Sequence, residues 1–289
     1  MARELGDVLH YFIDEPVARR GSSAVPEHGS RGAPAERAGS APSRAPRGEP
    51  ALVHGHTGET LQPARPVLAV PVGERDVVRS SLAWNLAVEL ARAGHHATLV
   101  APECRGRDLP WPDSGPAPLG AQLVSTFADD LTTLATTVAD VSAAGVGPGR
   151  EGMVLARFPA EWLDEPSSAA PLLRWTLLFA TPDAQDLEIA FVLIQGLLQR
   201  SPASRVGVTL HGVRSIEEAR EAFLTLAARC ERAGSRPLLS YGLLVDDLDF
   251  YRAIVERRPI GLARPQSRAA RALGDVARLL WEDAAAGRC

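Results

Sequence analysis

Short apolar runs alternate with longer segments of helical periodicity from residue 67 onward, and this alternation points to a single fold class. The apolar runs occupy residues 67–72, 97–101, 153–158, 175–181 and 205–211. The helical patterns lie between and after them, at about residues 77–94, 127–144, 183–200, 215–234 and 267–285. Strands buried on both faces read as continuous apolar runs, and the helices between them supply the crossovers of a parallel sheet. The sequence therefore predicts an α/β domain at residues 67–289 with a doubly wound, mostly parallel sheet.

The chain ahead of this domain has two parts of different composition. Residues 15–66 contain eight prolines and seven glycines without a period and few large apolar side chains, which predicts a disordered linker. Residues 1–14 instead carry apolar side chains at helical spacing, which predicts a short amphipathic helix and a candidate docking motif formed by Leu5, Val8, Leu9 and Phe12. A groove on a partner, the chain's own domain and a frayed terminus with chance periodicity are the three interpretations of this segment.

The sequence contains no lysine, and all 31 of its basic residues are arginine. Codon bias is one explanation, but no mechanism that needs a lysine ammonium can operate in this chain, whatever the cause. The net charge of −4 predicts no binding to nucleic acid. No run approaches the ~20 apolar residues of a membrane span, and the first residues lack the apolar core of a signal peptide, so we expect a cytoplasmic protein and no integral membrane segment.

The segment VLAVPVGERDVVRSSLAWNLAVELARAGHHATLV (residues 67–100) carries a recognisable order of motifs. A strand and a loop are followed by Asn85-Leu86-Ala87, a helix, the A-x-x-G of residues 91–94 and a second strand. This order resembles the opening of the MinD/ParA family of P-loop ATPases, which includes FlhG-like proteins. The resemblance implies a P-loop NTPase fold.

Three later segments resemble the same family in the same order. Residues 180–183 (ATPD), followed by a helix, resemble the family's T-P-E turn, and residues 246–259 resemble its D-x-x-v-x-x-A-v-x-x-x-x-P stretch. The last-helix signature P-x-S-x-x-A-x-x-I is matched by Pro265, Ser267, Ala270 and Leu273. The resemblance covers residues 67–283.

The family's phosphate loop, S-G-K-G-G-V-G-K-T-T, aligns with Gly73, Glu74, Arg75, Asp76, Val77, Val78, Arg79, Ser80 and Ser81. In a working loop, glycines turn backbone N–H groups toward the phosphates, and a lysine neutralises the transferring charge. Here Glu74 stands at the family's signature lysine, Val78 at a glycine and Arg79 at the phosphate lysine. Gly73 and the Mg²⁺-type hydroxyl of Ser80 are retained. The resemblance therefore implies a degenerate phosphate loop and a pseudo-ATPase.

The other polar positions of the family also differ in this chain. The second strand ends in residues 101–103 (APE) where the family has D-x-D, and the third strand offers Ala156 and Arg157 where an aspartate is expected. The family's base-reading asparagine falls at His211. Because a helix N-terminus attracts anions, we expect Asp76 to cap the helix near residue 77 and Glu74 to add a second carboxylate there. The protein's own anions then occupy the place of the phosphates.

These observations predict a non-catalytic scaffold or regulator that binds a protein partner in a positioning, motility or assembly system. No cofactor, metal or catalytic residue is expected, and the protein is expected to be a monomer or a nucleotide-independent oligomer. One alternative is a residual switch that binds ATP or ADP with Mg²⁺ weakly through Arg79 and Ser80. The other is an unrelated enzyme in the crevice at the carboxyl ends of the strands. His54 and His56 lie in the predicted linker, and the three cysteines lack metal-site spacing.

Overall fold

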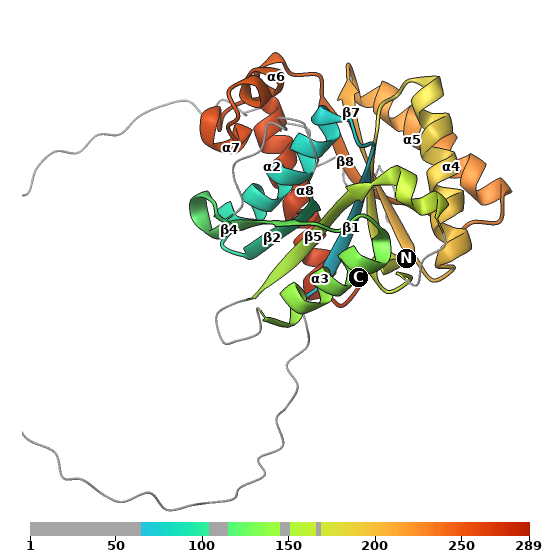
Figure 1. The fold of residues 1–289 in the computed structure, drawn as a ribbon. Helices are drawn as coiled ribbons and strands as arrows, with labels where there is room; N and C mark the ends of the chain where they lie inside the picture. Colours follow the sequence, from blue (N-terminus) through green and yellow to red (C-terminus); the bar gives the residue numbers. More distant parts are fainter. Residues whose placement is uncertain (1–64, 104–114, 145–150, 166–168) are drawn as a thin grey trace, which may run out of the picture. The chain divides into compact units, whose positions relative to one another are not determined.

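The computed structural model describes residues 65–103, 115–144, 151–165 and 169–289, whose strands form one sheet (Figure 1). Seven parallel strands run in the order β4-β2-β5-β1-β6-β7-β8, and the two-residue β3 (Gly115–Pro116) pairs antiparallel with β4 at one edge. The seven are β1 (Val67–Val72), β2 (His96–Pro102), β4 (Ala121–Thr126), β5 (Gly152–Pro159), β6 (Trp175–Ala180), β7 (Arg205–Val213) and β8 (Leu239–Val245). The predicted doubly wound, mostly parallel sheet is confirmed.

Helices cover both faces of the sheet (Figure 1). One layer is built on α2 and α8, which pack on each other, and it comprises α2 (Val77–Arg92), α6 (Leu248–Val255), α7 (Ile260–Ala263) and α8 (Arg268–Ala285). The other layer comprises α3 (Leu131–Ala144), α4 (Ala184–Arg200) and α5 (Ile216–Arg232), with the short 3₁₀ helices η3 (Ala160–Asp164) and η4 (Leu172–Arg174). A further 3₁₀ turn, η2 (Pro118–Gly120), precedes β4.

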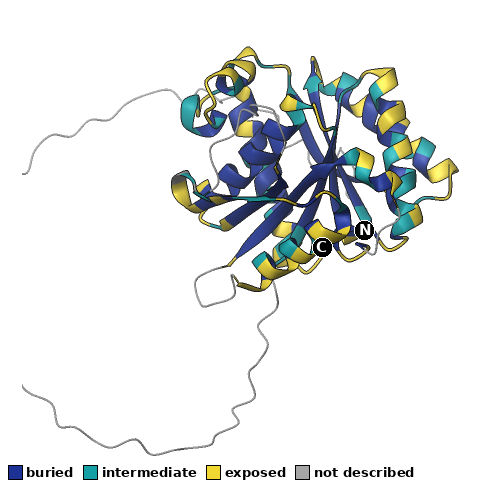
Figure 2. Ribbon diagram, in the orientation of Figure 1, coloured by how far each residue is buried: buried dark blue, intermediate teal, exposed yellow. Residues whose placement is uncertain are grey.

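The helix α2 is buried along most of its length, as its dark colour in Figure 2 shows. It packs on the sheet and against α8, and its residues from Ser80 to Ala91 are all buried. This burial fixes the start of α2 against the carboxyl ends of the central strands. The core therefore holds the helix that follows the turn from β1.

All five apolar runs form strands and all five helical patterns form helices, but β4, β8 and α6 were not predicted from the sequence. The strand β4 (AQLVST) lies near the edge of the sheet and is only partly covered, so its sequence is half polar. In β8, Ser240 and Gly242 interrupt the apolar run. The helix α3 starts four residues after its predicted beginning, because Asp130 caps it through the Thr133 N–H at 2.7 Å.

A buried polar network ties β6, β8 and α8 together inside the core. The indole N–H of Trp175 donates to the Tyr241 hydroxyl at 3.1 Å, and this hydroxyl donates to Asp283 at 2.7 Å. All three residues are buried. The Tyr241 ring packs against Gly207 on β7, where an added Cβ would be 2.2 Å from the ring. The position of the tyrosine thus depends on the absence of a side chain at Gly207.

The described part of the domain begins at Arg65, two residues ahead of the domain start predicted at residue 67. Hydrogen bonds to α3 hold Arg65 in place. Its guanidinium donates to the Val141 carbonyl at 2.5 Å, and its own carbonyl accepts a bond from the Ser142 hydroxyl at 2.7 Å. The predicted helix at 1–14, with Leu5, Val8, Leu9 and Phe12, and the predicted linker up to residue 64 lie outside the described residues. Among the described residues, no helix is both long and apolar enough to cross a membrane.

Candidate functional site

The turn from β1 into α2 lies at the carboxyl edge of the sheet, where parallel α/β sheets place their ligand sites. The Asp76 N–H donates to the Gly73 carbonyl at 2.9 Å, and the Val77 N–H donates to the Arg75 carbonyl at 3.1 Å. Asp76 is the N-cap of α2, because its side chain accepts a bond from the Arg79 N–H at 2.8 Å. The predicted cap is confirmed.

These bonds use backbone donors that a bound phosphate would need. The Ser80 N–H donates to the Asp76 carbonyl at 3.0 Å, so the N–H groups of residues 76, 77, 79 and 80 all have acceptors within the protein. A phosphate-binding nest also requires left-handed backbone positions. Among the described residues, the non-glycine residues with positive φ are Leu119 and Arg257, and both lie outside this turn. The backbone here forms a capped turn and not an anion nest.

The side chain of Arg79 is held by acidic groups on two sides. Its guanidinium lies 3.2 Å from the Asp76 carboxylate and 2.5 Å from the Asp186 carboxylate on α4. Its Nε donates to Nε2 of His211 at 3.3 Å, at the end of β7. The cation at the phosphate-lysine position is therefore balanced by two carboxylates from this chain. Neither Asp186 nor its contact with Arg79 was predicted from the sequence, because α4 is more than a hundred residues away along the chain.

Asp186 is itself fixed by several donors. One of its oxygens accepts from the Thr181 N–H at 2.5 Å and from the Thr181 hydroxyl at 3.0 Å, in addition to Arg79. Burial alone would raise the pKa of this carboxyl, but the bonds from Thr181 and the Arg79 guanidinium outweigh burial and hold the pKa below its usual value. Asp186 is thus an anion at neutral pH and acts as a counter-ion of Arg79.

The imidazole of His211 is buried beside this ion pair. Burial, and secondly the positive charge of Arg79, lower the pKa of His211 from 6.5 to about 4, although Asp186 and Asp76 act in the opposite direction. The neutral ring is the form that can accept the bond from Arg79 Nε. At neutral pH the cluster therefore holds one cation, two carboxylates and an uncharged imidazole.

His211 should make the folded state less stable as the pH falls. The unfolded chain takes up a proton near pH 6.5 while the folded chain does so only near pH 4. The unfolding free energy should therefore be about 2 kcal/mol lower at pH 5 than at pH 7 from this group alone. Chemical denaturation of the natural protein and of the His211→Asn variant at both pH values checks this. Because asparagine does not titrate, the difference in pH dependence between the two proteins is the contribution of His211. An equal pH dependence in both proteins would contradict it.

A second arginine contacts the retained hydroxyl of the loop. Arg157, on β5, is fully buried, and its Nη2 donates to the Ser80 hydroxyl at 3.2 Å. The strand register places Arg157 beside Val70 in the centre of the sheet. The sequence predicted the loss of an aspartate at this position, and the structure adds that the replacing cation reaches Ser80.

A groove of about 480 Å³ lies beside this cluster, between α4 and η3. Its walls combine apolar side chains from β1, β6 and α4 with five ionisable groups, of which one is basic and four are acidic: Arg79, Glu161, Asp164, Asp186 and Glu188. Its position at the carboxyl ends of the strands matches the crevice expected from the sequence. Its charge is the opposite of what a nucleotide would need, because phosphates are anions.

The nine residues of the aligned loop do not all contribute to this cluster. Asp76, Arg79 and Ser80 make the contacts described above, and Gly73 lines the groove. The side chains of the other five make none of these contacts: Glu74, Arg75 and Val77 are exposed, Val78 is half-buried and Ser81 is buried. The expected second carboxylate therefore comes from Asp186 and not from Glu74.

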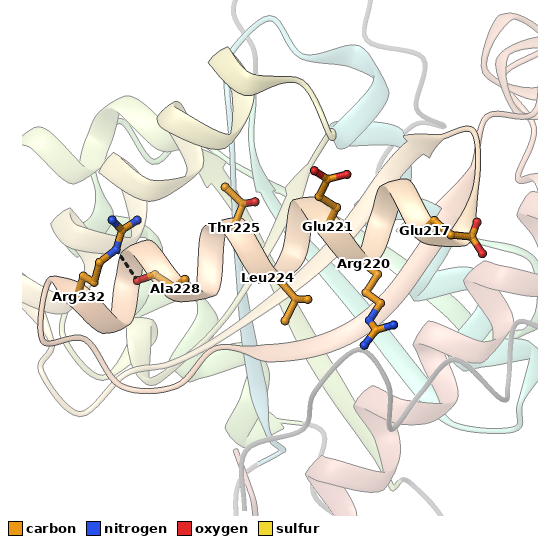
Figure 3. A pocket seen from close by; sticks show the side chains of 7 residues that line it. All are labelled: Glu217, Arg220, Glu221, Leu224, Thr225, Ala228 and Arg232. Atoms are coloured by element: carbon orange, nitrogen blue, oxygen red, sulfur yellow. Dashed lines mark hydrogen bonds between the residues drawn. The ribbon is translucent and has the colours of Figure 1, made fainter.

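A further hollow lies on the outer face of α5, as the close-up in Figure 3 shows. Its seven lining residues all belong to this one helix: Glu217, Arg220, Glu221, Leu224, Thr225, Ala228 and Arg232. Because side chains from one helix face cannot converge around a ligand, this surface offers no catalytic arrangement. It carries exposed acidic and apolar side chains, none of which lines the groove.

Comparison with known proteins gives a structural likeness without a sequence match. No family model and no curated protein matches the sequence. The MinC:MinD cell division complex of Aquifex aeolicus matches with a TM-score of 0.56 at 16% identity over 75% of this chain and 96% of that one. A ParA family ATPase from Chlorobium tepidum matches with a TM-score of 0.51 at 15% identity, over 75% of this chain and 99% of that one.

MinD from Pyrococcus horikoshii, solved with Mg-ADP, matches with a TM-score of 0.52 at 12% identity, over 75% of this chain and 96% of that one. The matched chains are thus covered almost completely, while a quarter of this chain lies outside the match. At these identities the likeness establishes the fold and nothing about activity. The domain has the fold of the MinD/ParA-type P-loop ATPases.

Proposed function

We propose that this protein is a non-catalytic scaffold or regulator, which keeps a MinD/ParA-type fold and uses it to bind a protein partner. The observation that carries the proposal is the closed charge cluster at the phosphate loop. Arg79 is paired with Asp76 and Asp186, and the backbone donors of the turn are bonded within the protein. ATP would have to displace two carboxylates and four backbone bonds before its phosphates reached the same groups.

The residues at the magnesium position argue against Mg²⁺·ATP as well. Mg²⁺ is bound through oxygen ligands, usually with one or two carboxylates close by. Here the Ser80 hydroxyl accepts a bond from the Arg157 guanidinium, so a divalent cation on this oxygen would face a fixed positive charge. The residues around Ser80 therefore suit neither Mg²⁺ nor a nucleotide. The proposed function involves neither of them.

The setting of this function is inferred from the fold and from the N-terminal sequence. The Aquifex aeolicus relative was solved in complex with a protein, MinC, so a domain of this shape can carry a protein partner. The amphipathic pattern of Leu5, Val8, Leu9 and Phe12 precedes the domain, as a short helical motif does in FlhG. On this basis we place the protein in a cellular positioning, motility or assembly system. The residual nucleotide switch is the alternative, and measurements of ATP binding distinguish the two.

The proposal predicts that ATP does not change the oligomeric state. In the parent family, nucleotide and a signature lysine join two subunits face to face, whereas Glu74 stands at the lysine's position in this chain. Two facing copies would bring like charges together, which costs free energy at low dielectric. Light scattering of the full chain with and without ATP and Mg²⁺ should give the same molecular mass. A doubling of the mass that depends on ATP would refute this prediction and support the nucleotide switch.

A further inference from the structure

We propose that the groove between α4 and η3 is the docking site for a partner segment that combines basic side chains with large apolar ones. The inference rests on the proposed function and adds to it the position of the binding surface and the chemistry of the partner. In the groove, apolar side chains and negative charge lie together.

The apolar part of the groove includes exposed side chains of α4. Ile189 and Val192 are 48% and 58% exposed, and both line the groove together with the more deeply placed Phe179 and Leu193. Contiguous apolar surface of this kind on a soluble domain is typical of an interaction site. A partner side chain such as leucine or phenylalanine would cover it.

The charged part of the groove determines the sign of the charge that a partner must carry. Asp186 is neutralised by Arg79, and Glu188 forms an ion pair with Arg229 from α5. The side chains of Glu161 and Asp164, on η3, have neither a hydrogen bond nor an ion pair with any described residue. At the rim of the apolar surface, two carboxylates thus have no counter-ion among the described residues. Charge complementarity then requires arginine or lysine in the partner, placed beside its apolar anchor.

The segments of this chain that precede the domain do not have this combination. Residues 1–14 are apolar but carry three acidic side chains and a single arginine, so the rim would repel them. The stretch 15–64 contains arginines, but its large apolar residues are few and scattered among prolines and glycines. A second copy of the chain, packed groove to groove, would bring four rim carboxylates together. The occupant that fits is therefore a different protein.

A peptide selection tests the chemistry assigned to the occupant of the groove. A displayed library of random peptides of about 12 residues is selected on the immobilised full chain, and each enriched peptide is re-tested on variants by fluorescence anisotropy. One variant removes the exposed apolar side chains (Ile189→Gln with Val192→Gln), and one neutralises the rim (Glu161→Gln with Asp164→Asn). The matched controls on α5 are Leu224→Gln, at a side chain 50% exposed, and Glu217→Gln with Glu221→Gln.

We expect a class of enriched peptides with net positive charge and at least two large apolar residues. Both groove variants should weaken their binding by about tenfold or more, while the α5 controls leave it unchanged. Binding should also weaken with added salt, because rim charges attract through solvent. Enriched peptides that are acidic or neutral, that bind the groove variants normally, or that depend on α5 would overturn the proposal, and so would a selection that yields no groove-dependent peptide.

The proposed function is tested separately by nucleotide binding. If the groove binds basic peptides and ATP also binds, the scaffold without nucleotide is wrong, the nucleotide switch is favoured and the docking site is right. If ATP does not bind and the selection finds no groove-dependent peptide, the non-catalytic function is retained and the docking site is wrong. The two ideas therefore fail independently.

Discussion

Replacing Gly207 with alanine should lower the unfolding free energy by about 3 kcal/mol, at the upper end of the range for overpacked cores. The new Cβ would lie 2.2 Å from Cε2 and 2.5 Å from Cδ2 of Tyr241. The ring cannot move aside easily, because Tyr241 is fully buried and its hydroxyl is bonded to Trp175 and Asp283. For a domain of this size we expect the melting temperature to fall by roughly 6–12 °C.

Gly196 supplies the matched control for this substitution. It lies inside α4, and a Cβ added there would have no heavy atom within 4 Å. Gly196→Ala should therefore raise the stability by about 0.5–1 kcal/mol, because alanine is the better helix former and restricts the unfolded chain. Thermal unfolding of both variants measures the contrast. Equal melting temperatures for the two variants would mean that Tyr241 is not confined as described.

Replacing Asp186 with alanine should lower the unfolding free energy by about 3 kcal/mol as well, because it breaks a partly buried ion pair. The change removes three hydrogen bonds, from the Arg79 guanidinium and from the N–H and hydroxyl of Thr181. Arg79 would keep Asp76 as its remaining carboxylate. With one counter-ion gone, inorganic phosphate should raise the melting temperature of this variant more than that of the natural protein.

Asp183, three residues earlier, is the control for the second prediction. It is exposed and caps α4 through the N–H groups of Gln185 and Asp186. Asp183→Ala should cost about 1 kcal/mol, the usual value for a lost N-cap, and should bring no response to phosphate. If the two aspartate variants lost the same stability and responded to phosphate equally, Asp186 would be an ordinary helix-end residue and not the counter-ion of the loop.

Much of the fold could be predicted from local sequence, because buried parallel strands and amphipathic helices have distinct periodicities. The runs at 67–72 and 205–211, for example, both form strands of the observed sheet. The prediction failed where burial is partial, as in β4, or where small residues interrupt the run, as in β8. Periodicity cannot report strand order, which is set by crossovers between distant segments.

The candidate site was predictable to the extent that it is local. Asp76 and Arg79 lie within one turn of each other, so the cap followed from their spacing and from the helix that begins beside them. Asp186 and His211 reach Arg79 from two later segments, and no feature of residues 67–100 indicates them. One feature of the sequence could have indicated Asp186. It follows the T-P turn at 181–182, and the end of that strand lies at the same sheet edge as the loop.

Thermal unfolding of the full chain with millimolar ATP and Mg²⁺ tests the central claim, that the protein's own side chains occupy the phosphate position. We expect no change in melting temperature, for the natural protein and equally for Arg79→Lys, because Asp76, Asp186 and the bonded backbone donors remain in that variant. An intact site with a Kd of about 10 µM would be stabilised by about 2.7 kcal/mol at one hundred times this concentration. That corresponds to a rise of roughly 5–10 °C. A rise of several degrees in the natural protein would mean that ATP reaches the phosphate position.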